Sequence, residues 1–426
     1  MYIDKVKRIF RQLNIKSWFF IYILMQTIVP IVAVFTSKFL TTYFYMVVVL
    51  TAVIFTLVSC RLLNVREFAL LLFPFIGYEI LNMFVTNSDD YLLAGYQILL
   101  FLLPVCLGFY VFKSNKRLPI YAAVITALFA VTAITTIIGC IRNPSAARIL
   151  ASTASSQDAT AIKFWWQNIG GYGFVYSAVL LYPCAVIAFK MKRLNTVVFI
   201  LLTVLLYALV INAEYSLALM FLMVSTLLLF VKKDLSVKKF LLMLILFVLI
   251  VVLFRTTIAA ILTRLGSYLG NEGMMEKINV LFLGKESVEG FDDARDELYL
   301  LSIKTFLSHP FFGCLKISSS GIGGHSFILD NLASFGLVGG ALMFFMYRGI
   351  YKVFFQPFSQ QPGYNMVFWV FLQTIILSTV NTGMWQFNLC VYAPIMFGYV
   401  YGIQAVESTR KDWRRVPARL IPKEDT

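Results

Sequence analysis

Charged residues are scarce in this chain, and histidine is almost absent. Only 13% of the 426 residues are charged and two are histidine, whereas 60% are hydrophobic. A soluble protein of this length keeps a largely polar exterior and cannot bury so much apolar surface. The scarcity of charge therefore excludes an ordinary water-soluble protein and indicates a chain embedded in a lipid bilayer.

Metal-binding and disulfide patterns are missing as well. No CxxC pair is present and no histidine or cysteine spacing matches a metal site, so we interpret the cysteines as packed free thiols. We expect no metal and no other cofactor. The six cysteines are scattered, most of them inside apolar segments, at Cys60, Cys106, Cys140, Cys184, Cys314 and Cys390.

A cleavable signal is also lacking, because the first apolar run is too long and has no small-residue cleavage site. We interpret it as the first transmembrane helix. A span needs roughly 20 apolar residues, and on that rule we predict an all-α, polytopic membrane protein with about twelve transmembrane helices. The predicted spans are 17–36, 39–60, 66–85, 91–112, 118–140, 168–189, 194–212, 214–231, 240–260, 326–346, 364–381 and 385–405.

Basic residues outnumber acidic ones, which gives a net charge of +15. They lie in short runs between apolar segments, such as Lys190, Lys192 and Arg193, and not on one soluble face. This distribution argues against a nucleic-acid partner and is typical of membrane topology. With a cytoplasmic N-terminus, every short basic segment falls on the inside, so we predict that both termini are cytoplasmic.

We expect a single membrane domain, residues 1–426, with two outer segments too long to be turns. The first covers about residues 141–167. The second is a large extracytoplasmic loop, residues 261–324, and a loop of this length in a compact fold is usually functional. Within it, Ala294–Ser308 has apolar residues at near-helical spacing, and we predict an amphipathic helix that covers the site as a lid. The basic tail, residues 406–426, is predicted to be cytoplasmic.

The most informative stretch is GIGGHSF, residues 321–327, where this loop meets the tenth span. A helix N-terminus presents unpaired N–H groups and a partial positive charge, which favour a phosphate. We therefore predict a catalytic role for His325 and a role in diphosphate binding for Ser326. The alternative is that both residues only cap the helix. Farther along, Gly336 and Gly340 form a GxxxG step, which predicts close helix packing.

Three arginines are candidate ligands of a diphosphate, because a guanidinium stays charged and donates several hydrogen bonds. Arg295 lies at the start of the amphipathic segment. The alternative to diphosphate binding is that Arg295 only forms a weak ion pair with Asp292 or Asp296. Arg255 and Arg264 lie near the outer end of the ninth span. There they either snorkel to the interface or face a polar cavity.

Three carboxylates fall within or next to predicted spans, where such groups are rare enough to be functional candidates. Asp330, about one turn into the tenth span, is the candidate catalytic carboxylate, which orients a histidine or accepts a proton. Glu214 lies in an outer turn and Glu79 in the middle of the third span. The alternative for each is a protonated or paired carboxyl that holds helices together.

The order of these motifs resembles the O-antigen ligase and polymerase superfamily of bacterial membrane glycosyltransferases. The resemblance rests on Arg295, on the step HPFFG at residues 309–313, and on His325 entering a helix that carries Gly336 and Gly339. One departure is Glu214, which stands in a turn where many members have a serine-arginine pair. Arg255 or Arg264 is the candidate substitute for that arginine.

The resemblance implies an enzyme at the outer face of the inner (cytoplasmic) membrane. Its donor is an oligosaccharide on a polyprenyl diphosphate, its acceptor is another glycan or a lipid, and it uses neither metal nor nucleotide. In such proteins arginines hold the diphosphate and the loop histidine serves the reaction centre, roles that fall here on Arg295 and His325. We therefore expect a polymerase of O-antigen, capsule or exopolysaccharide repeat units in the cell envelope, with other polysaccharide-assembly proteins as partners.

Three alternatives stay open at this point. A ligase of the same superfamily transfers glycan to a lipid or protein acceptor. A transporter of lipid-linked oligosaccharide places polar residues near the bilayer midplane in repeated halves, whereas here they gather at one face without a visible repeat. Only Glu79 favours transport. A non-catalytic membrane scaffold needs no arginine-histidine loop pattern.

Overall fold

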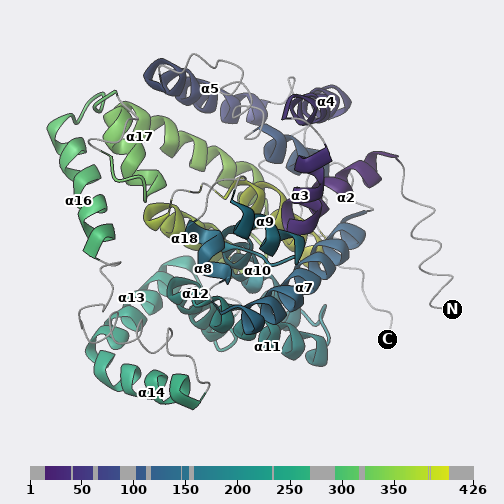
Figure 1. Ribbon diagram of the computed structural model, residues 1–426, viewed down its shortest axis with the longest axis vertical. Coiled ribbons are helices and arrows are strands. Elements are labelled where there is room, and N and C mark those ends of the chain that lie inside the picture. The colour runs from purple at the N-terminus through teal and green to yellow at the C-terminus, as the bar shows by residue number, and fades with distance from the viewer. Residues whose placement is uncertain are drawn as a thin grey trace.

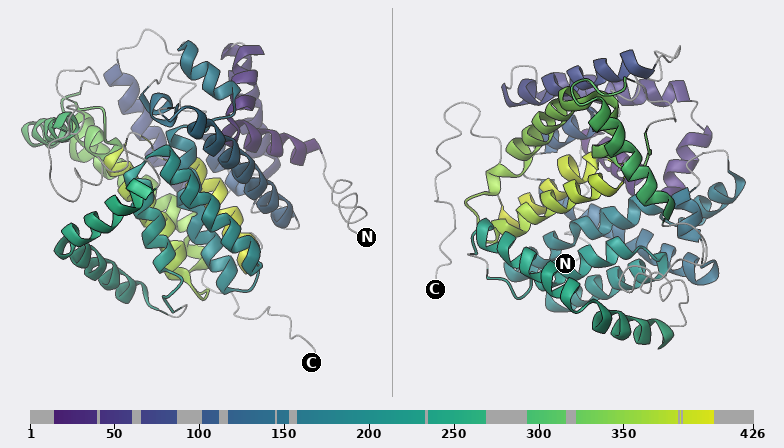
Figure 2. Two further views of the ribbon diagram at one scale, coloured as in Figure 1. Left: turned by 60° about the horizontal axis from the view of Figure 1, so that its bottom comes forward. Right: turned by 90° about the vertical axis from the view of Figure 1, so that its left-hand side faces the viewer.

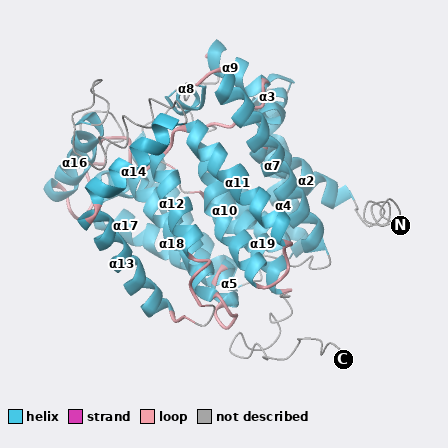
Figure 3. Cartoon of the chain, turned by 90° about the horizontal axis from the view of Figure 1, so that it is seen from below, coloured by secondary structure: helices cyan, strands magenta, loops and turns pink. Residues whose placement is uncertain are grey.

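Every regular element in the described part of the chain is a helix, and no strand occurs there (Figure 3). The computed structural model describes residues 15–39, 42–60, 66–86, 102–111, 117–144, 146–152, 158–232, 235–268, 293–315, 322–381, 383 and 385–402. Over these residues the predicted all-helical class is confirmed. The predicted basic tail, and residues 269–292 and 316–321 of the predicted large outer loop, lie outside them.

The helices follow the apolar runs, because backbone N–H and C=O groups in lipid must be satisfied within the segment itself. Figure 1 shows their arrangement. Besides a helix over Leu102–Val111, the elements are α2 (Ile15–Ile28), α3 (Pro30–Phe39), α4 (Thr42–Cys60), α5 (Arg66–Thr86), α7 (Leu118–Arg142), α8 (Ala146–Ser152), α9 (Ala159–Trp166), α10 (Tyr172–Lys190), α11 (Thr196–Ala213), α12 (Ser216–Leu227), α13 (Val237–Leu253), α14 (Arg255–Tyr268), α16 (Asp293–Ser308), α17 (Phe327–Phe354), η3 (Gln356–Phe358), α18 (Tyr364–Val380), η4 (Asn388–Tyr392) and α19 (Ala393–Tyr401).

Four of these helices are long and apolar enough to cross a membrane: α7, α10, α11 and α17. The bent pair formed by α2 and α3 adds a fifth if it is one span. The outer helices also carry large apolar side chains on their exposed faces. On α11, for example, Val197, Leu201 and Val204 are each more than 60% exposed. Such a surface suits hydrocarbon and not water, so these helices indicate a membrane protein.

A helix lies in every segment predicted as a span, but four of those segments are irregular: the tenth, which bends at Gly336, and the first, ninth and twelfth. The first is bent by 102° between Ile28 and Pro30, where proline lacks an N–H and its ring clashes with the preceding turn. The ninth breaks at Phe254 into α13 and α14, and the twelfth begins as the π-helix η4. Twelve crossings therefore stay a prediction.

A polar turn secures the first break. Asn168 adopts left-handed backbone (φ 57°), a conformation that asparagine tolerates better than most residues. Its side-chain Oδ1 accepts from the N–H of Ile31 at 3.3 Å, directly after the break, and its Nδ2 donates to Thr135 Oγ1 at 3.0 Å. Asn168 therefore links α3 to α7. It directly follows the first segment predicted to lie outside, which contains the short helices α8 and α9.

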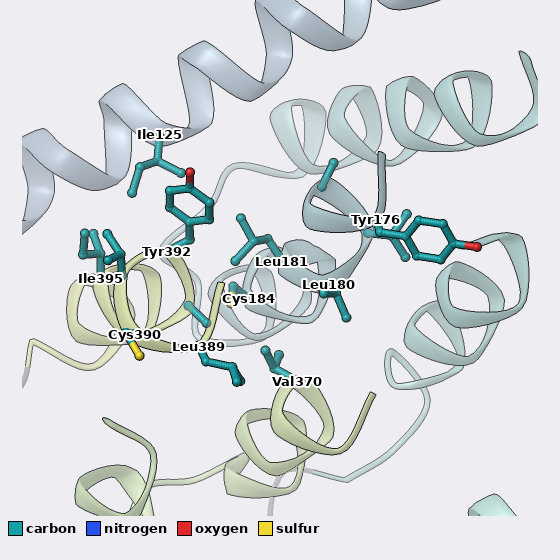
Figure 4. Close-up of a cluster of buried hydrophobic side chains, with 14 of the residues drawn as sticks. Ile125, Tyr176, Leu180, Leu181, Cys184, Val370, Leu389, Cys390, Tyr392 and Ile395 are labelled. Atoms are coloured by element: carbon teal, nitrogen blue, oxygen red, sulfur yellow. The ribbon is translucent and has the colours of Figure 1, made fainter. Parts of the chain in front are cut away.

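The core is built around α10. This helix packs against α11, α12, α18 and α19, and the right-hand view of Figure 2 shows the yellow C-terminal helices between the purple N-terminal helices and the teal helices. Figure 4 shows the side chains of Leu180 and Cys184 meeting Val370 and Leu389 at its centre. All four side chains are fully buried. The described part of the chain is therefore held by one apolar centre.

Candidate functional site

The helices α16 and α17 form a joint that contains most of the residues predicted to be functional. A helix is present where one was predicted: α16 begins within one residue of the expected start and packs along α17 (Figure 1). Its predicted amphipathic character is not confirmed, because the apolar side chains of Ile303 and Leu307 are exposed. The second helix, α17, bends at Gly336, where φ is 61° and ψ is −153°. We refer to the segment HPFFG and the two residues that follow it, 309–315, as the docking loop.

The docking loop supplies hydrogen-bond partners for the backbone groups of α17 that lose their helical partners at this bend. In a regular helix the carbonyls of Ala333 and Ser334 accept from the N–H groups four residues later, and the bend breaks both bonds. Instead, the N–H groups of Cys314 and Leu315 donate to these carbonyls, at 2.9 and 3.1 Å. Both freed acceptors are thus satisfied, as buried backbone groups must be.

The freed donors of α17 are satisfied in the same way. The N–H of Leu337 donates to the carbonyl of Pro310 at 2.8 Å, and the N–H of Val338 donates to that of Phe311 at 3.2 Å. Four hydrogen bonds to the docking loop therefore replace two broken helical bonds. The sequence motif HPFFG and the glycine of the tenth span are two halves of one structural unit.

Two glycines allow this close approach. A Cβ on Gly313 would lie 2.3 Å from the Ser334 carbonyl group, and one on Gly336 would lie 2.4 Å from the Phe311 carbonyl carbon. Both residues also have positive φ, at 70° and 61°, where a side chain is strained. Gly336 of the predicted GxxxG step therefore packs against the backbone of the docking loop, at a bend in α17, and not against a second helix.

Asp330 stands at the centre of a polar network at the start of α17. Its Oδ1 accepts from the hydroxyl of Ser302, on α16, at 2.6 Å, and its Oδ2 accepts from the N–H of Ser326 at 2.9 Å. The hydroxyl of Ser302 also accepts from the N–H of Gly323 at 2.9 Å. Asp330 thereby fixes the loop on both sides of His325 to α16. A carboxylate in the first turn of a helix also interacts favourably with the helix dipole.

The N-terminus of α17 is largely satisfied from within the protein. Ser326 is the N-cap and is fully buried; its Oγ accepts from the N–H of Leu329 at 3.0 Å. The N–H of Phe327 donates to the carbonyl of Asn381 at 2.8 Å. The capping alternative for Ser326 is therefore realised, and this helix end leaves few free donors for a phosphate. Diphosphate binding by Ser326 stays a prediction.

His325 is held by this network but is itself exposed. Gly324, which precedes it, has left-handed backbone (φ 71°) and open space around it. The imidazole makes no hydrogen bond to any residue that the structure describes. The backbone on either side is thus fixed, while the ring is free to meet a substrate. His309, the other histidine, is exposed as well and is the first residue of the docking loop; its N–H donates to the carbonyls of Thr305 and Phe306 at the end of α16.

Arg295 lies in the first turn of α16, on the stripe of that helix that faces the start of α17 and the end of α18. Residues four and seven positions apart share one face of a helix. Tyr299 and Ser302 stand at these spacings from Arg295. The Tyr299 hydroxyl donates to the carbonyl of Val380 at 2.9 Å, and Ser302 binds Asp330. The position of Arg295 is thus on the same face as the His325 loop.

The other candidates are separate from this joint. Arg255 and Arg264 are exposed on α14, at the bottom of Figure 1, away from α16 and α17. Glu214 ends α11 with left-handed backbone (φ 59°). Glu79 lies in α5 beyond its midpoint. The structure therefore brings together His325, Ser326 and Asp330, places the backbone of Arg295 in the first turn of the adjacent helix α16, and does not bring the two α14 arginines to them.

Ser302 and Asn381 were not anticipated from the sequence. Ser302 is fully buried on the helix that pattern alone predicts correctly, and a single serine in an apolar stripe carries no signal. Asn381 contributes only its carbonyl, which any residue possesses. Neither role was recognisable without the fold.

Replacing Ser302 by alanine is expected to destabilise the protein by about 1.5–3 kcal/mol, because a hydrogen bond to a charged group is lost. Thermal unfolding in detergent measures this change. Ser308→Ala is the matched control on the same helix, since its exposed hydroxyl only bonds the Lys304 carbonyl; it is expected to change stability by less than about 0.5 kcal/mol. Equal melting temperatures for the two variants would contradict a structural role for Ser302.

Comparison of the chain with models of known protein families finds no match, and comparison with curated proteins finds none.

Proposed function

We propose that this protein is a membrane glycosyltransferase that polymerises repeat units of a surface polysaccharide. The observation that carries the proposal is the joint of α16 and α17, which presents an exposed His325 on a loop tied to Asp330, with Arg295 on the facing stripe of α16. The motif order that resembles the O-antigen ligase and polymerase superfamily supports the same function.

The proposed reaction joins an acceptor hydroxyl to the anomeric carbon of a glycan carried on a polyprenyl diphosphate. The acceptor oxygen forms the new bond to the anomeric carbon, while the bond from that carbon to the phosphate oxygen breaks. The diphosphate leaves with the electron pair, and His325 takes the proton of the acceptor hydroxyl as general base. Arg295 stabilises the charge that develops on the diphosphate.

Asp330 acts in this scheme as a positioning residue. Its two carboxylate oxygens are engaged by Ser302 and by the N–H of Ser326, so it holds the loop that carries His325 and does not itself remove the proton. Positioning matters because a small displacement of a catalytic group lowers the rate strongly. A conservative Asp330→Asn change is therefore expected to reduce kcat more than it raises KM.

The membrane positions the lipid-linked donor. A polyprenyl tail stays in the hydrocarbon while its diphosphate reaches the interface, and the apolar exterior of α11 and α17 suits such a lipid. We further propose that the chain crosses the inner membrane about twelve times, with both termini cytoplasmic and the α16–α17 joint at the outer face.

The test uses purified protein and the lipid-linked repeat unit extracted from the host strain. Wild-type protein is expected to give a ladder of products, with the same yield in EDTA. Arg295→Ala is expected to lower kcat/KM about a hundredfold or more, and Arg295→Lys to recover part of it, because lysine keeps the charge but lacks the planar fork. Lys304→Ala, which removes an exposed cation from the same helix, is expected to keep the wild-type rate.

Two outcomes would replace the proposed function, and a third would change only the residue assigned to the diphosphate. A single addition that requires a lipid or protein acceptor identifies a ligase. Movement of the same lipid across vesicles without product identifies a transporter. Full activity in Arg295→Ala leaves a polymerase that holds its diphosphate elsewhere, for which Arg255 and Arg264 are the next candidates.

A further inference from the structure

Four aromatic side chains from three separate segments meet at the start of α10. Tyr172 and Tyr176 lie one turn apart on that helix, with ring centroids 4.4 Å apart. Tyr215, at the start of α12, lies 5.3 Å from Tyr172 and 5.7 Å from Tyr176. Trp385 completes the group at 6.2 and 6.0 Å from the same two rings. We call these four residues the aromatic cluster.

The aromatic cluster borders the apolar core and is not enclosed in it. Tyr172, Tyr215 and Trp385 are each half-buried, whereas Tyr176 is buried. Figure 4 shows the Tyr176 hydroxyl pointing away from the other labelled core side chains. Gly173, directly after Tyr172, is exposed, with open space where a Cβ would stand. The cluster therefore presents an edge that is both aromatic and polar.

Trp385 has two features that core packing does not explain. Its backbone is left-handed (φ 57°), which is rare and unfavourable for a bulky residue. Its indole Nε1 is buried without a hydrogen-bond acceptor among the described residues, although such groups are normally paired. Strained backbone and unpaired buried donors concentrate at binding sites, so both features point to a ligand that supplies an acceptor.

The segment that carries Trp385 also touches the α16–α17 joint. Four residues earlier, the carbonyl of Asn381 accepts from the N–H of Phe327 at the start of α17. Three residues later, Asn388 pairs with Ser177 of α10, its Oδ1 accepting from the Ser177 hydroxyl at 2.9 Å. A fully extended chain spans at most about 14 Å over four residues. The cluster is therefore within reach of an oligosaccharide whose end lies at His325.

We propose that the aromatic cluster is a carbohydrate subsite, which holds one pyranose ring of a glycan chain whose end lies at His325. A pyranose presents a face of C–H groups that packs on aromatic rings, and its hydroxyls offer acceptors for the Trp385 indole N–H. The Tyr215 hydroxyl already donates to the carbonyl of Ala147 at 2.6 Å, so this residue contributes its ring. The assignment of this glycan rests on the proposed function. The binding itself requires neither the lipid nor the diphosphate.

The experiment measures binding of free sugar, so that it does not depend on catalysis. Mild acid releases the oligosaccharide from the lipid-linked repeat unit, and isothermal titration reports its affinity for the purified full-length protein. Trp385→Leu and Tyr172→Leu are each expected to weaken binding about tenfold, because aromatic contact is lost while an apolar side chain is kept. Trp385→Phe keeps a ring but loses the N–H. Its affinity for the oligosaccharide is expected to lie between that of the two leucine variants and that of the wild type.

Controls separate binding from folding and from the reaction. Trp18→Leu removes a largely exposed indole from α2 and is expected to bind as wild type does. If Trp385→Leu has a lower melting temperature than the wild type, Trp385→Phe, which keeps most of the packing, is used in its place. Unchanged affinity in Trp385→Leu, Tyr172→Leu and Trp385→Phe would overturn the subsite even if the ladder forms. Conversely, cluster-dependent sugar binding without any ladder supports the subsite and removes the polymerase.

Discussion

Replacement of His325 by alanine is expected to slow polymer formation by about a hundredfold or more, the usual contribution of a general base. The residue is exposed, and the backbone around it is fixed through Ser302, Asp330 and Ser326, so the change removes the imidazole and leaves the loop in place. Release of polyprenyl diphosphate in a single turnover at saturating donor measures the effect. The KM for the donor is expected to stay near the wild-type value, because diphosphate binding is assigned to Arg295.

Two further measurements make this prediction specific to the base. Free imidazole in the buffer is expected to restore part of the rate of His325→Ala, since the position is open to solvent. His309→Ala is the matched control, because this second histidine is exposed too and joins the docking loop through its backbone. A full rate for His325→Ala, or an equal loss for His309→Ala, would end the case for His325 as the base.

Replacement of Gly336 by alanine is expected to destabilise the protein by more than about 3 kcal/mol, or to prevent folding. With φ 61° and ψ −153°, Gly336 lies in a backbone region that essentially only glycine adopts, so an alanine there is unfavourable by roughly 1–3 kcal/mol. The new Cβ would also collide with the Phe311 carbonyl carbon at 2.4 Å. Overpacking adds about 1–3 kcal/mol more. Gly313→Ala is expected to behave in the same way, since its Cβ would meet the Ser334 carbonyl group at 2.3 Å.

Gly324 provides the control that separates these two contributions. Its φ is 71°, close to those of Gly313 and Gly336, but nothing lies within 4 Å of the position of a Cβ. Gly324→Ala is therefore expected to lose only roughly 1–2 kcal/mol, from the backbone conformation alone. Melting temperatures of the three variants in the same detergent make the comparison. Similar losses in all three would show that the close contact of the docking loop with α17 is unimportant.

The sequence predicted those features that depend on local pattern. The helix at Ala294–Ser308 follows from its apolar spacing and from Pro310 behind it, and α16 ends at Ser308 as expected. The predicted position of Asp330 one turn into the tenth span is also confirmed. Both follow from short-range rules of helix period and helix termination.

Features that depend on a distant partner could not be predicted in this way. Gly336 lies in an apolar run that has the pattern of a continuous span, and only the carbonyls of Pro310 and Phe311 make its bend favourable. The break at Phe254 contains neither proline nor glycine. The bend at Pro30 had a visible cause, but the acceptor that stabilises it, Asn168, lies 137 residues after its donor Ile31. In each case the deciding contact is made by another part of the chain.

The contact between the docking loop and α17 also constrains how this sequence can diverge. A side chain at Gly313 or at Gly336 is blocked by the backbone of the other segment, and no compensating substitution can make a backbone smaller. Neither glycine can therefore be replaced during evolution, whereas the apolar residues around them can be exchanged for other apolar residues. Distant relatives of this protein are thus better sought through this pair of fixed glycines, in order and with His325 between them, than through similarity summed over the whole chain.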